Sequence, residues 1–283
     1  MEKVKTFVAI CTILLLFPYI TVTLSGHERE TTAFADEELL EQWVLEILPG
    51  QMPISYEPEA LKAQAILVRS NLMYYMERDQ KEISHVTDTT VEAWGLSGYS
   101  YEDLQELWNR EDFEAYYGKI YSAVEETRGK VLQYEGRYVD IPYHAVSAGK
   151  TRSGELLGEN YGYLQAVECS KEVEAENFVE IKRLDITEPV EILSLDDSGY
   201  VLEVKVGETH MAGEVFRNTY GLSSGCFSLQ QEKEALVAVA KGLGHGFGMS
   251  LYQAQRMAEE GADCFNILNY FYENLTVRDL SEK

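Results

Sequence analysis

The chain has 283 residues, of which 45% are hydrophobic and 25% charged, a balance typical of folded globular proteins. Its formal net charge is −24, and so acidic a chain repels nucleic-acid phosphates, so we set nucleic-acid binding aside. The length suits one large domain or two of medium size. The four cysteines have neither CxxC nor Cys/His ligand spacing, which supports neither a disulfide framework nor a zinc finger.

An uncharged, mostly apolar run covers residues 7–24, and about 17–25 such residues cross a bilayer. Lys3 and Lys5 precede the run and an acidic stretch follows it, so the positive-inside bias places the N-terminus in the cytoplasm. The alternative is a cleaved signal peptide, but the small-x-small sequence Ala33-Phe34-Ala35 lies eleven residues beyond the run. In either case the pattern predicts that the large domain is exported.

We therefore predict a single-pass protein of the cell membrane whose large domain lies outside the cytoplasm. The predicted parts are a cytoplasmic tail (1–6), a transmembrane anchor (7–24), a linker (25–35) and one large domain (36–283).

Within the large domain, helical patterns come first and strand patterns follow. The predicted elements are helices at 36–48, 57–76 and 101–127, hairpin strands within 130–146 and 178–206, a helix from about 249 and a last helix at 266–274. Pro49-Gly50 is expected to end the first helix, and Pro58 suits the first turn of the second. The order predicts an α+β fold: a mainly helical N-terminal part, then mixed β-strands and a C-terminal helical segment, preceded by one transmembrane helix.

Two segments combine polar residues with small ones. Gln51-Met52-Pro53 leads into a helix on which Gln64 and Arg69 fall on or near a side made of small residues. Residues 143–151 place His144 at a strand end, followed by small and hydroxyl residues that suit contact with a ligand. Helix packing and a structural histidine are the alternative interpretations of these two patterns.

Two further segments are rich in glycine or lie in a loop. Residues 242–250 (GLGHGFGMS) contain four alternating glycines, which allow close approach of the backbone to a ligand or positive φ angles. The segment matches neither a Walker A loop nor the G-x-G-x-x-G dinucleotide fingerprint, and a structural turn is its alternative interpretation. Residues 213–227 read as a short helix and loop that carry Arg217.

These four segments, in this order, resemble the stage II sporulation protein D family, which also contains amidase-enhancer proteins. The similar stretches are MPISYEPEALKAQAILVRS, VEETRGKVLQYEGRYVDIPYHAVSAGKT, GYVLEVKVGETHMAGEVFRNTYGLSS and GLGHGFGMSLYQAQRMAEEGADCFNILNYFY. The resemblance implies action on peptidoglycan between two membranes during engulfment of the forespore. Family enzymes are lytic transglycosylases, in which one carboxylic acid protonates the leaving oxygen and then takes a proton from the attacking sugar hydroxyl.

The chain departs from the family at the residue on which this reaction depends. The family's catalytic glutamate stands just before Met-Pro, where this chain has Gln51. An amide is neither a useful acid nor a base near neutral pH, and losing a positioned acid/base typically costs about 10²–10⁴-fold in rate. Some family members bind zinc through nearby cysteines and a histidine, but this chain has no cysteine between Cys11 and Cys169. We therefore expect no metal and no cofactor.

The sequence thus predicts a peptidoglycan-binding or remodelling protein with weak or absent cleavage, which leaves open whether it is an enzyme. The expected partners are glycan strands and a cell-wall amidase or other engulfment proteins. The alternatives are an enhancer of a partner amidase, a sugar-binding wall module unrelated to sporulation, and an active lytic transglycosylase with a displaced carboxylate. Candidates for that carboxylate are Glu46, Glu57 and Glu59.

Gln51 holds the catalytic position, and we expect it to meet His144, Ser147 and His245 in one groove. The predicted substrate-binding residues are polar or flexible members of the shared segments: Gln64, Arg69, His144, Ser147, Lys150, Thr151, Gly244, His245, Gly246, Ser250 and Gln253.

Overall fold

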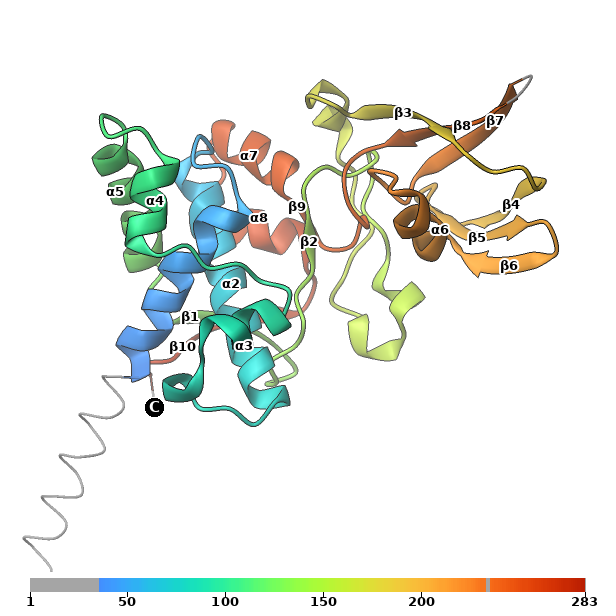
Figure 1. The fold of residues 1–283 in the computed structure, drawn as a ribbon. Coiled ribbons are helices and arrows are strands. Elements are labelled where there is room, and N and C mark those ends of the chain that lie inside the picture. Colours follow the sequence, from blue (N-terminus) through green and yellow to red (C-terminus); the bar gives the residue numbers. More distant parts are fainter. Residues whose placement is uncertain (1–35, 233–234, 283) are drawn as a thin grey trace, which may run out of the picture.

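The structure is a computed structural model that describes residues 36–232 and 235–282. Most helices gather on one side of the molecule and most strands, with α6, on the other, and two short strands, β2 (Tyr143–His144) and β9 (Met249–Ser250), lie between the two sides (Figure 1). The helices are residues 36–51, α2 (Pro58–Arg78), α3 (Asp88–Ala93), α4 (Tyr101–Leu107), α5 (Phe113–Glu126), α6 (Gly213–Tyr220), α7 (Leu251–Glu259) and α8 (Cys264–Phe271). Short 3-10 helices are η1 (Ile83–His85), η2 (Gly154–Leu157), η3 (Glu159–Tyr161) and η4 (Ser170–Glu174).

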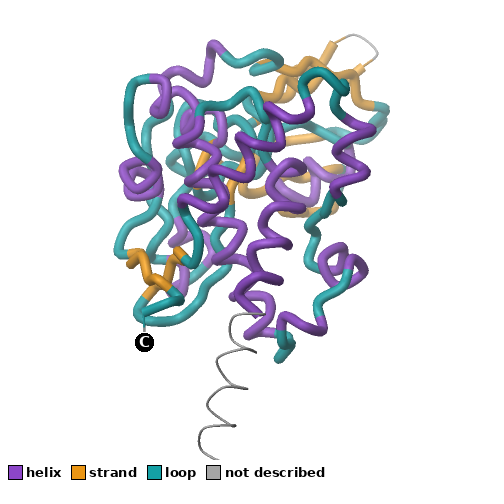
Figure 2. The backbone as a smooth tube through the Cα atoms, turned by 90° about the vertical axis from the view of Figure 1, so that its left-hand side faces the viewer, coloured by secondary structure: helices purple, strands orange, loops and turns teal. Residues whose placement is uncertain are grey.

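The helical half is built around α2. Every residue from Ala63 to Leu72 in this helix is buried, because α5, α7, α8 and the strand β1 (Lys130–Tyr134) all pack against it. A helix that is covered on all sides needs no single apolar stripe, which is why α2 also buries polar side chains. Seen from the side in Figure 2, helices form most of this half, and β1 with its partner β10 (Leu275–Asp279) lies beside the C-terminus.

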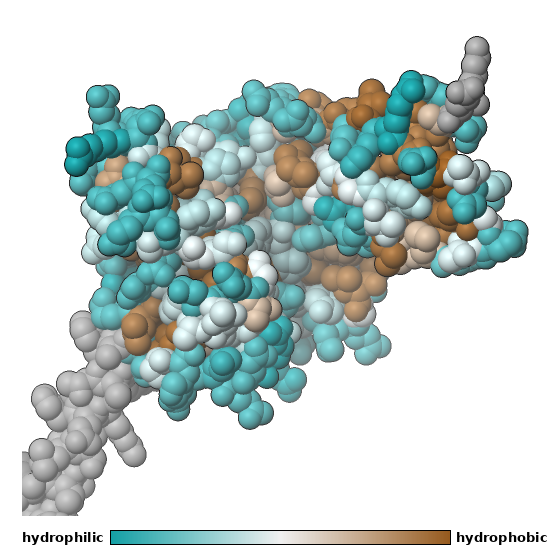
Figure 3. Space-filling model, viewed as in Figure 1, coloured by the Kyte–Doolittle hydropathy of each residue, from teal (hydrophilic) through white to brown (hydrophobic). Residues whose placement is uncertain are grey.

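The other half contains two three-stranded antiparallel sheets. One has the order β3 (Val179–Leu184), β8 (Ala235–Lys241), β7 (Phe227–Glu232), and the other has the order β4 (Val190–Leu195), β5 (Val201–Val206), β6 (Thr209–Ala212). Their inner faces share a core with α6, in which Val204 and Phe216 are fully buried. Apolar side chains also reach the surface of this half, among them Ile181 and Leu195, and the space-filling view shows brown patches there (Figure 3).

Two local predictions change in the folded chain. The first helix runs on through Gln51, because Pro49 removes only one hydrogen bond near the helix end and the Met52 N–H still reaches the Leu48 carbonyl at 3.3 Å. Of the hairpin predicted over 130–146 only the turn forms, where Tyr134 and Arg137 exchange two backbone hydrogen bonds of 3.0 Å. Beyond the turn the strands do not pair with each other, because β1 pairs with β10 and β2 pairs with β9. Alternation identifies a strand but not its partner. The second predicted hairpin is confirmed, since β4 and β5 pair in antiparallel fashion.

The mixed α+β composition agrees with the sequence prediction, but the transmembrane helix and the single-pass membrane location are corrected here. Within residues 36–232 and 235–282, no helix is long and apolar enough to cross a membrane. α2 has 21 residues, yet it carries Glu59, Lys62 and Arg69 and is enclosed by protein. The segment 7–24, on which the prediction rested, lies outside the described residues.

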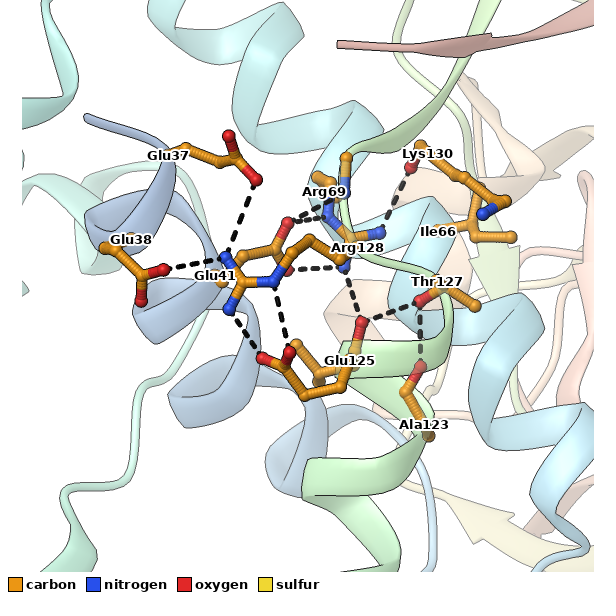
Figure 4. A network of polar contacts seen from close by, with 12 residues as sticks. Glu37, Glu38, Glu41, Ile66, Arg69, Ala123, Glu125, Thr127, Arg128 and Lys130 are labelled. Atoms are coloured by element: carbon orange, nitrogen blue, oxygen red, sulfur yellow. Dashed lines mark hydrogen bonds and ion pairs between the residues drawn. The ribbon is translucent and has the colours of Figure 1, made fainter. Parts of the chain in front are cut away.

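A buried ion pair ties the first helix to α2 and to the start of β1 (Figure 4). Arg69 is fully buried and donates from Nε and Nη2 to the two carboxylate oxygens of Glu41, at 2.9 and 2.6 Å. Its Nη1 donates to the Lys130 carbonyl at 3.1 Å, and the Gly129 N–H donates to the same carboxylate at 3.0 Å. Each charge therefore has hydrogen-bond partners, which is the condition for holding two charges in a protein interior.

Removing one member of this pair is expected to be costly. Arg69→Met should lower the free energy of unfolding by about 3–5 kcal/mol, because Glu41 is then a buried charge without a counter-ion. Urea titration of the purified protein measures the loss.

Two comparisons sharpen this stability test. The double variant Arg69→Met/Glu41→Leu should recover much of the loss, since it leaves no charge behind. Arg183→Met, which breaks a surface pair with Glu232, should cost less than about 1 kcal/mol. An effect of Arg69→Met no larger than that of Arg183→Met would contradict a structural role for the buried pair.

Candidate functional site

The candidate site lies where β2 and β9 meet between the two halves of the molecule (Figure 1). The two strands are parallel, and their register sets Tyr143 opposite Met249 and His144 opposite Ser250. This short pairing brings together two segments that the sequence analysis selected separately. Because β2 and β9 lie between the helical half and the sheet-rich half, the site residues on these strands lie there too.

The alternating glycines allow residues 242–248 to pass the 142–147 segment at backbone contact. Val146 and Leu243 exchange two backbone hydrogen bonds, at 3.0 and 2.7 Å. Gly244, Gly246 and Gly248 all have positive φ, and none has room for a Cβ. A Cβ on Gly244 would lie 2.7 Å from the Cβ of His144, and one on Gly248 would overlap the Pro142 carbonyl oxygen. Packing therefore accounts for these glycines, and ligand contact by Gly244 and Gly246 stays a prediction.

The glycine requirement can be separated into strain and collision. Gly136 and Gly248 have similar φ angles, +75° and +69°, but a Cβ on Gly136 would meet nothing within 4 Å. Gly136→Ala should therefore cost about 1–2 kcal/mol for the left-handed backbone alone. Gly248→Ala should cost about 1–3 kcal/mol more, because the side chain also collides with the backbone of residue 142. Urea midpoints of the two variants measure the difference, and equal losses would contradict the packing explanation.

The two site histidines lie side by side and are in opposite tautomers. Their ring centroids are 5.7 Å apart. Nδ1 of His144 lies 3.0 Å from the Phe247 carbonyl oxygen, which can only accept, so Nδ1 carries the proton and Nε2 is an acceptor. Nδ1 of His245 instead accepts from the Phe247 N–H at 3.1 Å, which leaves its proton on Nε2. No partner for the buried Nε2 of His144 is found among the described residues.

Both imidazoles are held in the neutral form. Burial, followed by the neighbouring His245, lowers the pKa of His144 to about 3. Burial also lowers the pKa of His245, although the Glu214 carboxylate opposes this shift. Near neutral pH the pair therefore offers hydrogen-bonding groups without charge.

Gln51 is connected to this pair through Tyr143. The Tyr143 hydroxyl donates to Oε1 of Gln51 at 2.6 Å, and Gln51 is partly exposed at the end of the first helix. Burial raises the pKa of Tyr143, and the side chain of Gln64 opposes this shift through hydrogen bonding, which places the Gln64 amide next to the phenol. Gln64 is fully buried, and neither atom of its amide has a partner of normal geometry among the described residues. Two neutral amides, those of Gln51 and Gln64, thus lie beside the Tyr143 hydroxyl.

A buried carboxyl group lies behind the site. The Ser250 hydroxyl donates to Oε1 of Glu172 in η4, and Ser147 also faces this carboxyl group. Glu172 is fully buried, and its other oxygen has no partner among the described residues. Burial raises the pKa of Glu172 to about 7, and the hydrogen bonds from the two serines oppose this shift. The sequence analysis missed Glu172, because residues 168–176 are polar and acid-rich and have no apolar periodicity that would mark a buried position.

The remaining predicted residues are distributed around the site or away from it. The Lys150 ammonium lies 3.3 Å from the Glu168 carboxylate, and the Thr151 hydroxyl donates to the Gln165 carbonyl at 2.8 Å, so both stabilise the neighbouring loop. Gln253 lies in the first turn of α7, where its backbone N–H is capped by Ser250.

Arg69 is not brought to the site, because its guanidinium group is committed to the buried pair with Glu41. His144 and His245 are neighbours, Gln51 contacts Tyr143 and Ser147 faces Glu172, while the convergence of Gln51, Ser147 and the two histidines on one groove and their role in binding stay predictions. In the described part of the chain, no group of three or more His, Cys, Asp or Glu is arranged to hold a metal ion.

The three carboxylates considered as displaced acids have other surroundings. Glu46 lines a hollow of about 310 Å³ together with Asp88 and other acidic residues, and burial raises its pKa. Glu57 is exposed and precedes α2. For Glu59 burial is outweighed by hydrogen bonds from Lys62 and from the N–H of residue 264, so its pKa is lowered and it remains ionised.

The raised pKa of Glu172 predicts a pH-dependent stability. The folded protein holds this proton more tightly than the unfolded chain, so the contribution of Glu172 is fully favourable below about pH 4.5 and is lost as the pH rises through about 7. Glu172→Gln keeps a neutral group at every pH. It should be more stable than the natural protein at pH 8, by up to about 3 kcal/mol, and should flatten the decline between pH 5 and 8. Urea titration at several pH values measures this dependence.

The matched control is Glu176→Gln, which changes an exposed residue close by in the chain. This variant should leave the pH dependence unchanged. An unchanged pH profile in Glu172→Gln would show instead that the buried carboxyl group does not titrate in this range.

Fold and site together define an α+β protein with a site of neutral amides, imidazoles and hydroxyls, set between a helical and a sheet-rich half. A family model described as "Stage II sporulation protein" matches residues 28–134. Stage II sporulation protein D of Bacillus amyloliquefaciens is 27% identical over 263 residues, which cover 86% of this chain and 74% of that protein. The amidase enhancer of Bacillus subtilis is 24% identical over 307 residues, covering 82% of this chain and 39% of that protein.

These matches confirm the resemblance to the stage II sporulation protein D and amidase enhancer family that the sequence motifs predicted. Stage II sporulation protein D of Bacillus subtilis, at 26% identity over 85% of this chain and 74% of that protein, gives the same result. The similarity supports a role related to sporulation and the cell wall.

Proposed function

We propose that the protein binds peptidoglycan glycan strands and takes part in cell-wall remodelling during sporulation, with weak or absent cleavage of the glycan. The names of its relatives point to sporulation and to the assistance of an amidase. Peptidoglycan binding without cleavage also suits a protein that assists a partner amidase. The partner, if one takes part, is then the hydrolase.

The observation that carries this proposal is the placement of Gln51. The resemblance assigns the catalytic carboxyl group to this position, and here an amide occupies it and accepts a hydrogen bond from Tyr143. An amide cannot protonate the leaving oxygen of a glycosidic bond, nor can it take a proton from the attacking hydroxyl. The neutral imidazoles of His144 and His245 are suited to hydrogen bonds with sugar hydroxyl and acetamido groups.

A second candidate function is cleavage through another carboxyl group, and one observation favours it. Burial raises the pKa of Glu172 to about 7, the range in which a general acid works best at neutral pH. Its side chain is fully buried, however, so the segment around η4 would have to open before this group could reach a sugar. Glu172→Gln distinguishes this function from the first.

Restoring the carboxyl group at position 51 tests the first function. Glutamine and glutamate are nearly isosteric, so Gln51→Glu should fold without strain. The natural protein is expected to release little or no anhydromuropeptide from purified peptidoglycan, and Gln51→Glu should gain cleavage that approaches the ~10²–10⁴-fold effect of a positioned acid/base. Mass spectrometry of the soluble products measures the gain.

The control is Gln42→Glu, which adds the same charge at an exposed position of the same helix and should gain nothing. Strong cleavage by the natural protein that is lost in Glu172→Gln or Glu59→Gln would favour the second function. No cleavage by either protein, with sedimentation of both on purified peptidoglycan, would support binding as the function. Absence of that binding would overturn the proposal.

A further inference from the structure

We infer that Tyr143 is the positioning residue for position 51: its hydroxyl turns Oε1 of Gln51 inward, so that Nε2 is the group offered to an acceptor oxygen of the glycan. This inference rests on the proposed function and deepens it, because it names the kind of ligand atom that the site recognises, an acceptor oxygen. It assigns a role to a tyrosine that the sequence analysis did not select.

The position of the Tyr143 hydroxyl is fixed by the fold. Tyr143 belongs to β2, its backbone is paired with Met249, and its ring packs against the main hydrophobic core of the helical half. The side chain of Gln51 has no such support, because it stands at the last residue of a helix and is partly exposed. The hydrogen bond of 2.6 Å between the Tyr143 hydroxyl and Oε1 of Gln51 therefore restrains the Gln51 amide in one orientation.

The direction of this hydrogen bond follows from the chemistry of its two atoms. A phenol has one proton to donate, and it also has lone pairs that accept, whereas an amide oxygen only accepts. The phenol proton is therefore directed to Oε1 of Gln51. The buried amide of Gln64 lies beside the same hydroxyl, but neither of its atoms has a hydrogen bond of normal geometry among the described residues.

The orientation of Gln51 decides whether this position offers a ligand hydrogen-bond donors or acceptors. With Oε1 occupied, Gln51 presents the two N–H donors of Nε2, which make no hydrogen bond to another residue in the described part of the chain. An N–H donor recognises an acceptor such as the glycosidic oxygen or the carbonyl of an acetamido group. A carboxylate at this position would instead accept from donors. An amide at position 51 thus favours binding of the glycan, whereas a carboxyl group at the same position would have led to its cleavage.

Tyr143→Phe tests the inference, because it removes only the hydroxyl and keeps the ring in the core. The side-chain amide of Gln51 is observed by NMR in protein labelled with ¹⁵N-glutamine, and its signal is identified by its absence in Gln51→Glu. We expect a distinct, protected amide signal in the natural protein and a solvent-averaged one in Tyr143→Phe. Affinity for purified soluble glycan strands should fall about 3–10-fold, the equivalent of one lost hydrogen bond.

The matched control is Tyr138→Phe, which removes another part-buried hydroxyl from the same connection and should change neither measurement. Thermal unfolding of both variants establishes that they fold. An identical Gln51 amide signal in the natural protein and in Tyr143→Phe would overturn the positioning role, whatever the affinity. An altered signal with unchanged affinity would overturn the assignment of the ligand contact. The amide measurement needs no glycan, so it stands even if the protein proves not to bind peptidoglycan.

Discussion

The contact between the glycine-rich segment 242–248 and the segment 142–147 is the constraint on which the site depends. Two backbones can approach so closely only where one of them lacks Cβ atoms, and the glycines meet this condition while also adopting positive φ. The contact holds β9 against β2, so His144 lies beside His245 and Tyr143 is aimed at Gln51. A structural requirement of the backbone thus decides which side chains become neighbours.

The buried ion pair between Arg69 and Glu41 also affects the site, although it lies away from it. The first helix carries both Glu41 and Gln51, and α2 carries both Gln64 and Arg69. Glu41 and Gln51 are ten residues apart, about 15 Å along a helix, so the ion pair fixes the two helices at one end, while Gln51 contacts Tyr143 at the end of the first helix. A bidentate pair tolerates little sliding, so it limits the movement of the first helix along α2. The buried ion pair therefore helps to fix the position of Gln51.

A chain with a net charge of −24 has nevertheless assembled a site of neutral groups. Burial keeps both imidazoles unprotonated, and it holds Glu172 partly protonated near pH 7. A site of uncharged donors and acceptors is better suited to bind a carbohydrate than to bind an anion or a metal ion. This agrees with the cell-wall role that the relatives support. On the proposed function, position 51 also lacks the acid that cleavage would require.

The sequence by itself determined the local features of this protein. Apolar periodicity predicted the long helix α2 and the α+β order, and the four motifs predicted the family and pointed to Gln51, His144 and the glycine-rich loop. Only the tertiary structure decided the partners: β2 pairs with β9 and not with β1, Arg69 binds Glu41 and not the site, and Glu172 is buried within a polar stretch. The reason is physical. Periodicity reports which face of an element is apolar, whereas pairing, burial of charge and pKa depend on what the rest of the chain brings against that face.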